Sequence, residues 1–113
     1  MVAQIPDRGD VLLVDLNPSL GSEQRNVSPR PCVVISGKAY NAASRLVVVC
    51  PLTKRRKGRA FEIPATFQDV RGAVLVEHVR SIDRVARNAH IIGTLDEPTM
   101  AHVLGKLQAL LFQ

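Results

Sequence analysis

The sequence predicts a mainly β protein: a small all-β barrel or sandwich with one C-terminal amphipathic α-helix. Short apolar runs rich in Val, Ile and Leu recur along the chain, and Gly, Pro, Asn and Asp separate them, which is typical of strands joined by turns. Only the C-terminal segment changes to the spacing of a helix. Because the chain has 113 residues, residues 1–113 are expected to form a single domain.

Five apolar runs carry the strand prediction, and two shorter segments follow them. In the fifth run, AVLVEHV, strict alternation would place Val74 and Val76 on one face and Leu75 and Glu77 on the other. Because apolar side chains would then occupy both faces, one face of this strand is expected to meet a partner. The runs lie at 11–15, 32–36, 46–50, 60–63 and 73–79, and the shorter segments at 80–83 and 89–94.

The C-terminal segment has apolar residues at every third or fourth position, which places them on one stripe of a helix. Asp96 can cap the start of this helix, and Pro98 suits its first turn. We therefore expect a helix beginning at Asp96 whose apolar stripe lies on the barrel. The stripe consists of Met100, Val103, Leu104, Leu107, Leu110 and Leu111.

The connection between the first two strands is long, running from about Leu16 to Pro31 and containing GSEQRNVSPRP at 21–31. Loops of about 15 residues are uncommon in compact domains and usually have a function or are disordered. Pro29 and Pro31 flank Arg30, and each proline restricts its own φ and the residue before it. We expect Arg30 to be held more firmly than the rest of this loop.

Basic residues concentrate in one interval of the chain. The formal net charge is +5, and the pI is near 9.9. No acidic residue occurs between Glu23 and Glu62, whereas nine basic residues do, five of them within KRRKGR at 54–59. A surface of one sign favours a phosphate backbone, because bound cations release condensed counterions. This distribution predicts a nucleic-acid partner.

Several classes of enzyme are not expected, because their motifs do not occur. The sequence has no H-x-x-x-H or C-x-x-C pair, so no metal site is predicted. It also has no P-loop, no G-x-G-x-x-G and no nucleophile elbow, so no nucleotide cofactor is predicted. Cys32 and Cys50 lie within apolar runs and are expected to be buried thiols.

The sequence also indicates a compartment. No apolar run reaches the roughly 18 residues that span a bilayer. The N-terminal segment lacks a basic region followed by an apolar stretch, so no signal peptide is expected. The cytoplasm is therefore the expected location, and no membrane partner is expected.

Segments along most of the chain together resemble one known family. They are RGDVLLVDLNPSLGSEQ at 8–24, RPCVVIS at 30–36, YN at 40–41, VVVCPLT at 47–53, GRAFEIP at 58–64 and GAVLVEHVRSID at 72–83. In combination they are similar to the MazF/PemK family of toxin endoribonucleases of type II toxin–antitoxin systems. The resemblance covers roughly residues 6–111 and includes the C-terminal helix.

This resemblance implies a compact SH3-like β-barrel with a C-terminal helix, assembled as a homodimer. It implies sequence-specific cleavage of single-stranded RNA without a metal or other cofactor, leaving a 2′,3′-cyclic phosphate and a 5′-hydroxyl. It also implies a cognate antitoxin, whose extended acidic C-terminal segment blocks the RNA groove.

The resemblance assigns Arg30 and Thr53 to catalysis and matches Glu23 to a loop glutamate. Arg30 suits the stabilisation of a phosphorane, because its guanidinium stays charged and can grip two phosphate oxygens. Thr53 can donate a further hydrogen bond to the phosphate. The base stays open between Glu23 and His78: a histidine titrates near neutrality (about 6.5), whereas a glutamate (about 4.3) needs partial burial.

Further residues are expected to bind RNA around these groups. Phe61 is the candidate for base stacking, with a core role as the alternative, and the basic run should supply affinity without sequence information. The chain departs from the family pattern in the longer segment RNVSP after Gln24 and in Glu77-His78, where Asp-Gln is common. The expected RNA-binding residues are Gln24, Arg25, Lys54, Arg55, Arg56, Lys57, Phe61, Glu77 and Arg80.

Two other functions fit the same fold. One is a toxin that poisons gyrase and performs no chemistry, since another toxin family shares this barrel. The other is a non-catalytic SH3-like module that binds nucleic acid or protein. The gyrase-poisoning toxin would have no use for Arg30 and Thr53 as a pair, whereas the binding module predicts salt-sensitive RNA binding with no product formed.

Overall fold

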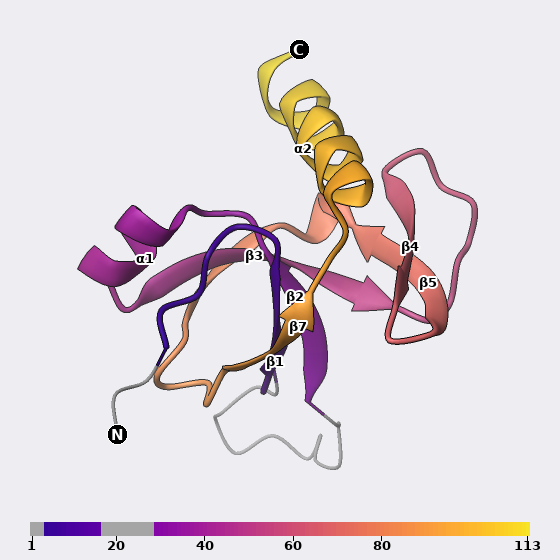
Figure 1. Ribbon diagram of the computed structural model, residues 1–113. Coiled ribbons are helices and arrows are strands. Elements are labelled where there is room, and N and C mark those ends of the chain that lie inside the picture. Colours follow the sequence, from indigo (N-terminus) through magenta and orange to yellow (C-terminus); the bar gives the residue numbers. More distant parts are fainter. Residues whose placement is uncertain (1–3, 17–28) are drawn as a thin grey trace, which may run out of the picture.

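The computed structural model describes residues 4–16 and 29–113. Within these ranges one curled antiparallel sheet is combined with three helical segments (Figure 1). The strands are β1 (Asp10–Val14), β2 (Arg30–Val34), β3 (Leu46–Thr53), β4 (Glu62–Phe67), β5 (Val70–Leu75), β6 (Arg80–Asp83) and β7 (His90–Thr94). The helices are α1 (Lys38–Ala43), the 3₁₀-helix η1 (Val76–His78) and α2 (Glu97–Phe112).

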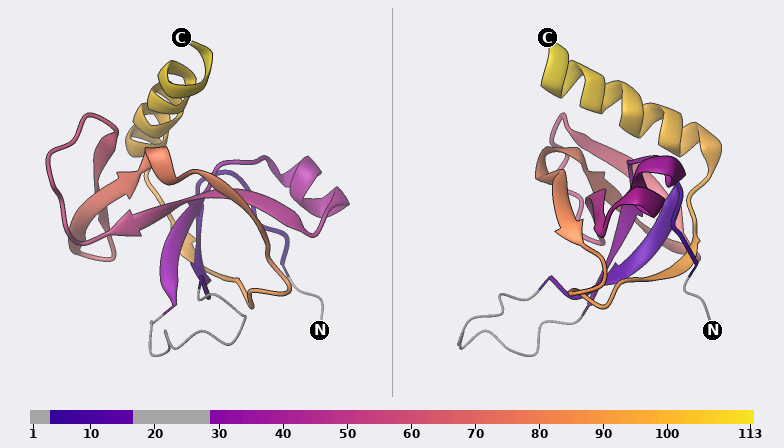
Figure 2. Two further views of the ribbon diagram at one scale, coloured as in Figure 1. Left: turned by 180° about the vertical axis from the view of Figure 1, so that it is seen from behind. Right: turned by 90° about the vertical axis from the view of Figure 1, so that its left-hand side faces the viewer.

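Strand β3 pairs with three other strands and joins the two parts of the sheet. The strand order is β4-β5-β3-β2-β1-β7, and β6 pairs with β3 off this path. The first part of β3 pairs with β6 and β2, whereas its last residues, Leu52 and Thr53, pair with β5. The sheet therefore curls into a half-barrel, with the β4–β5 hairpin at the opposite end from α1 (Figures 1 and 2). The prediction of a mainly β fold with a C-terminal helix is confirmed.

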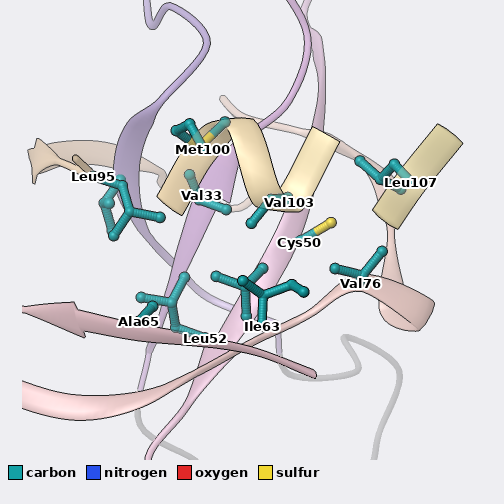
Figure 3. Packing of buried hydrophobic residues seen from close by; sticks show 12 residues of the cluster. Val33, Cys50, Leu52, Ile63, Ala65, Val76, Leu95, Met100, Val103 and Leu107 are labelled. Carbon is teal, nitrogen blue, oxygen red and sulfur yellow. The ribbon is translucent and has the colours of Figure 1, made fainter. Parts of the chain in front are cut away.

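Alternation along the strands divides the core into two apolar clusters. On β1, Val11 belongs to one cluster, and Leu12 and Val14 belong to the other. Helix α2 covers the first cluster with Met100 and other apolar residues (Figure 3). The second cluster is enclosed by β1, β2, β3 and β6. Several strands are buried on both faces of the sheet, which explains why their sequences are continuous apolar runs.

Helix α2 begins as the sequence predicts. The Asp96 carboxylate accepts a hydrogen bond of 3.0 Å from the Thr99 backbone N–H, and its bonds from Thr99 lower the pKa of this carboxyl. The apolar stripe is only partly buried: Met100, Val103 and Leu107 are in the core, whereas Leu104 and Leu111 are exposed. In the described part of the chain, no helix is long and apolar enough to cross a membrane.

The strand expected at 73–79 was wrong at both ends. Strand β5 begins at Val70 because it forms a hairpin with β4, in which Phe67 pairs with Val70. It ends at Leu75, and the chain turns into η1, where the Val76 N–H donates to the Phe61 oxygen. Val76 is still buried, but Glu77 and His78 lie on this turn rather than on a strand.

Helix α1 has no counterpart among the predicted elements. Its Asn41 is fully buried. The Asn41 side chain donates to the backbone oxygens of Pro6 (2.9 Å) and Ser36 (3.0 Å). The helix is therefore fixed by a buried amide that joins it to the N-terminal segment, a contact that no periodicity reveals.

Candidate active site

Arg30 is the first residue of β2 and stands opposite Val14 of β1. Its Nη2 donates a hydrogen bond of 2.8 Å to the backbone oxygen of Leu52, near the end of β3. A guanidinium has five N–H donors, and among the described residues only this bond is formed. Arg30 is thus anchored to the neighbouring strand while it keeps donors and a positive charge for a ligand.

Thr53 is the last residue of β3 and pairs with Ala73 of β5. Its Oγ1 accepts a hydrogen bond of 3.1 Å from the Arg55 backbone N–H. Because the oxygen acts as the acceptor, the hydroxyl hydrogen remains free to donate to a ligand. The structure therefore provides a second donor close to the strand end that holds Arg30.

Gly72 lets β5 approach Thr53 closely. A Cβ built on Gly72 would lie 2.0 Å from the Thr53 backbone oxygen, so any side chain here would force the two strands apart. In the sequence, Gly72 stands between Arg71 and Ala73, directly before the fifth apolar run. A glycine at a strand position can mark a close backbone approach.

Arg30 and Thr53 line one groove with a volume of about 570 Å³, within the range of small-molecule sites. Lys54 and Arg55 of the basic run line the same groove. No carboxylate of the described residues does, so the groove is positively charged. The β4–β5 hairpin and β7 form its other wall, with Phe67, Gln68, Val70 and Ile92.

Glu77 and His78, predicted as site residues, lie elsewhere. Both are exposed on η1, and with Phe61 they line a separate small hollow. Phe61 itself packs against the first apolar cluster, and the Lys106 ammonium lies 5.4 Å from its ring centroid. Phe61 therefore contributes to the core and to a cation–π contact, while Phe67 is the aromatic residue that lines the groove.

The basic run is folded into a turn by Glu62. One carboxylate oxygen, Oε1, accepts from the backbone N–H groups of Lys57 (2.8 Å) and Gly58 (3.1 Å). Gly58 has a φ of 73°, which favours glycine. Arg56 and Lys57 are exposed on this turn and do not line the groove. They add positive charge beside it.

Arg80 and the two cysteines complete the surroundings. Burial raises the pKa of Cys32 to about 11, although the charges of Arg30 and Arg80 act in the opposite direction. Arg80, predicted to bind RNA, is exposed on β6 and does not line the groove. Burial also raises the pKa of Cys50 to about 12. Both thiols are buried and free, as predicted, and a neutral buried thiol is a poor nucleophile.

Three predicted site residues, Glu23, Gln24 and Arg25, lie outside the described residues. The prediction that Arg30 is held more firmly than the rest of its loop also concerns residues outside the described ranges. Among residues 4–16 and 29–113, no group of three or more His, Cys, Asp or Glu side chains is placed to hold a metal ion.

Comparisons with known proteins agree on one family. The family model of PemK-like, MazF-like toxins of type II toxin–antitoxin systems matches residues 7–111. The endoribonuclease toxin MazF of Escherichia coli (strain K12) is 35% identical over 107 residues, which cover 95% of each chain.

Solved structures agree with the sequence relatives. A crystal structure of MazF from Deinococcus radiodurans superposes with a TM-score of 0.83 at 36% identity, covering 97% of this chain and 99% of that one. The toxin in a MazE–MazF crystal structure from the same organism gives a TM-score of 0.81 at 32% identity, with coverage of 97% and 98%.

Proposed function

Because the chain belongs to the PemK-like, MazF-like toxin family of type II toxin–antitoxin systems, we propose that it is a sequence-specific endoribonuclease that cleaves single-stranded RNA without a metal. The observation that carries the proposal is that Arg30 and Thr53 share one groove with Lys54 and Arg55 and with no described carboxylate. Such a groove suits a phosphodiester, and its donors suit a phosphate whose negative charge increases during reaction.

The proposed reaction is an intramolecular transesterification. The 2′-oxygen of the RNA attacks the adjacent phosphorus, the bond from phosphorus to the 5′-oxygen breaks, and a 2′,3′-cyclic phosphate and a 5′-hydroxyl form. One group must take the proton of the 2′-hydroxyl, and another must deliver a proton to the leaving 5′-oxygen. The substrate supplies the nucleophile, so the protein needs no covalent intermediate.

Arg30 stabilises the phosphorane in this proposal. The anchor to the Leu52 oxygen fixes the guanidinium before the substrate arrives, so little reorganisation is needed during the reaction. Thr53 donates its hydroxyl hydrogen to a phosphate oxygen, because its Oγ1 already accepts from Arg55. Loss of one such donor typically lowers the rate by about 10²–10³.

The general base is Glu23 or His78. Glu23 lies outside the described residues, and His78 lies beside the separate hollow rather than the groove. Glu23→Gln and His78→Gln distinguish them: loss of the base should lower kcat/KM by roughly 10²–10⁴, the usual contribution of general acid–base catalysis, whereas loss of the other group should leave kcat/KM near the wild-type value.

The proposal includes two protein partners. One is a second copy of the chain, as a homodimer, and the other is a cognate antitoxin with an acidic extended C-terminal segment. What supports the antitoxin is the net charge of +5, the cation-lined groove and the similarity to a toxin crystallised with MazE. An acidic segment would compete with RNA for the same positive charges.

The test is to incubate the purified chain with long single-stranded RNAs in EDTA. We expect discrete cuts that leave 2′,3′-cyclic phosphate ends, and we expect Arg30→Ala to be about 10²–10³ times slower. Arg45→Ala is the matched control, because Arg45 is exposed and pairs with Asp83 away from the groove; its rate should equal that of the wild type.

Two results would contradict the proposal. One is the absence of cuts in EDTA across varied RNAs, and the other is an Arg30→Ala protein that cuts as fast as the wild type. Trapped gyrase–DNA cleavage complexes with intact RNA would instead favour the gyrase-poisoning alternative.

A further inference from the structure

The groove continues beyond the catalytic pair to a wall whose function the proposed reaction does not explain. Arg30, Thr53 and the two cations Lys54 and Arg55 form one part of its lining. The other part comes from the β4–β5 hairpin and β7, and it combines apolar side chains with one amide, that of Gln68. A phosphate held at Arg30 would therefore have an apolar wall with a single hydrogen-bonding side chain beside it.

Gly93 of β7 makes room for the Phe67 ring on this wall. A Cβ on Gly93 would lie 2.8 Å from Phe67 Cζ and 3.7 Å from Gln68 Nε2. The absence of a side chain at Gly93 thus lets the ring and the amide lie against the backbone of β7. The ring packs against the first apolar cluster, as that of Phe61 does, and it is only partly buried. The part of an aromatic ring that stays exposed beside a phosphate site is a platform on which a nucleobase can stack.

Gln68 has a positive φ, which is an unfavourable backbone conformation for a residue with a side chain. Because Phe67 pairs with Val70, the hairpin loop consists of Gln68 and Asp69 alone, with φ values of 50° and 65°. Positive φ at both positions matches a type I′ turn, which favours Asn and Gly and costs other residues stability. Gln68 Nε2 donates a hydrogen bond of 3.0 Å to the Ile92 backbone oxygen, which joins the turn to β7.

This hydrogen bond also orients the amide. A carbonyl oxygen only accepts, so the Gln68 nitrogen must face Ile92. One N–H donor and the amide oxygen then remain on an exposed side chain that lines the groove. An adjacent donor and acceptor is the pattern with which a side-chain amide reads the edge of a base.

We infer that Phe67 and Gln68 form a nucleobase subsite, in which the base next to the cleaved phosphate stacks on Phe67 and Gln68 reads its hydrogen-bonding edge. This inference rests on the proposed function, because the phosphate at Arg30 places the base. Gln68 is then a specificity-determining residue: it selects the RNA sequence and takes no part in proton transfer.

The experiment measures cleavage of a single-stranded RNA library with every base at each position around the cut. Gln68→Ala should still cut, but the preference at one position should fall by roughly 5- to 100-fold. Gln68→Glu keeps the length of the side chain but replaces the amino group, and with it the donor to the Ile92 oxygen, with a second acceptor. The preference at that position should therefore shift toward bases that present an amino group. Preferences at the other positions should not change.

Asp69→Gly is the matched control, since Asp69 shares the turn and the positive φ but does not line the groove. Its cleavage preferences should equal those of the wild type. Unchanged preferences in both Gln68 variants would overturn the inference and leave the endoribonuclease proposal standing. Equal relaxation in Gln68→Ala and Asp69→Gly would also overturn it, because turn geometry rather than the amide would then be the cause.

If the wild type cuts nothing, the proposed function fails. The same library, bound at equilibrium to the wild type and to each variant, then decides the subsite. Selective retention of one base by the wild type and not by Gln68→Ala supports it, and equal retention overturns it. This binding measurement also applies if a Gln68 variant loses cleavage altogether.

Discussion

At the scale of single residues, the position of Thr53 depends on a neighbour with no side chain. Gly72 brings the β5 backbone against the Thr53 carbonyl, where a Cβ would come within 2.0 Å of the oxygen. Backbone atoms cannot rotate away as a side chain can. A larger residue at 72 would therefore displace the end of β3, which also supplies the Leu52 oxygen that anchors Arg30.

We expect Gly72→Ala to lower the free energy of unfolding by roughly 1–3 kcal/mol, the usual cost of overpacking, and to slow RNA cleavage. Denaturant unfolding and the cleavage assay measure the two effects. Gly105→Ala is the matched control: nothing lies within 4 Å of its Cβ in α2, and alanine is the better helix former by about 1 kcal/mol. Equal stability of the Gly72→Ala protein and the wild type would contradict the close approach.

At the scale of elements, the segment between β3 and β4 shows how one carboxylate can organise a basic turn. The turn includes Lys57 and Gly58, whose backbone N–H groups both donate to Glu62 Oε1. Glu62 begins β4, so the sheet holds the base of the turn. The negative charge of Glu62 lies next to five basic residues and weakens their attraction for RNA. The hydrogen bonds that Glu62 accepts restrict the conformation of the turn.

We expect Glu62→Ala to lower the free energy of unfolding by about 1.5–3 kcal/mol, the typical value for hydrogen bonds to a charged group. Trypsin should then cut faster within 54–59, because the turn opens more often. Glu62→Gln is the matched control, since it removes the charge but keeps an acceptor oxygen, and its cutting rate should stay near that of the wild type. Equal trypsin rates for all three proteins would show that Glu62 does not restrain the turn.

At the scale of the whole molecule, one end of α2 leaves apolar surface uncovered. Leu111 is 56% exposed and Phe112 is 80% exposed. Leu104, which is partly exposed, lies two turns before Leu111 on the same face of the helix. The sequence prediction of a partner was based on the fifth strand, where Val74 and Val76 are buried and Leu75 is half-buried within the monomer. The exposed end of α2 is the stronger argument for a second copy.

We expect the chain to sediment as a homodimer, with a mass close to twice its 12.3 kDa. The double substitution Leu111→Lys and Phe112→Lys should lower this mass toward that of a monomer, because burial of ammonium groups in an apolar contact is costly. His102→Lys adds a charge on the side of the same helix opposite Leu111 and more than two turns away from it, and it should have no such effect. A monomeric wild type at micromolar concentration would contradict the homodimer.

The sequence by itself determined the features whose signals are local. Apolar runs predicted the β class, and the Asp96 cap with the apolar spacing after it predicted α2, because capping and periodicity act between residues a few positions apart. Burial of both cysteines followed from the same runs. Motifs similar to one toxin family drew attention to Arg30 and Thr53, whose catalytic roles stay predictions.

Only the tertiary structure decided which side chains meet. Because β3 pairs with β2 and also with β5, Arg30 and Thr53 share a groove with Gln68, whereas His78 turns away on η1. The fifth strand ends early because its register is set by the hairpin with β4, in which Glu62, the first residue of β4, pairs with Leu75. The contacts that form the groove join residues far apart in the chain and depend on close backbone approach, which local spacing does not encode.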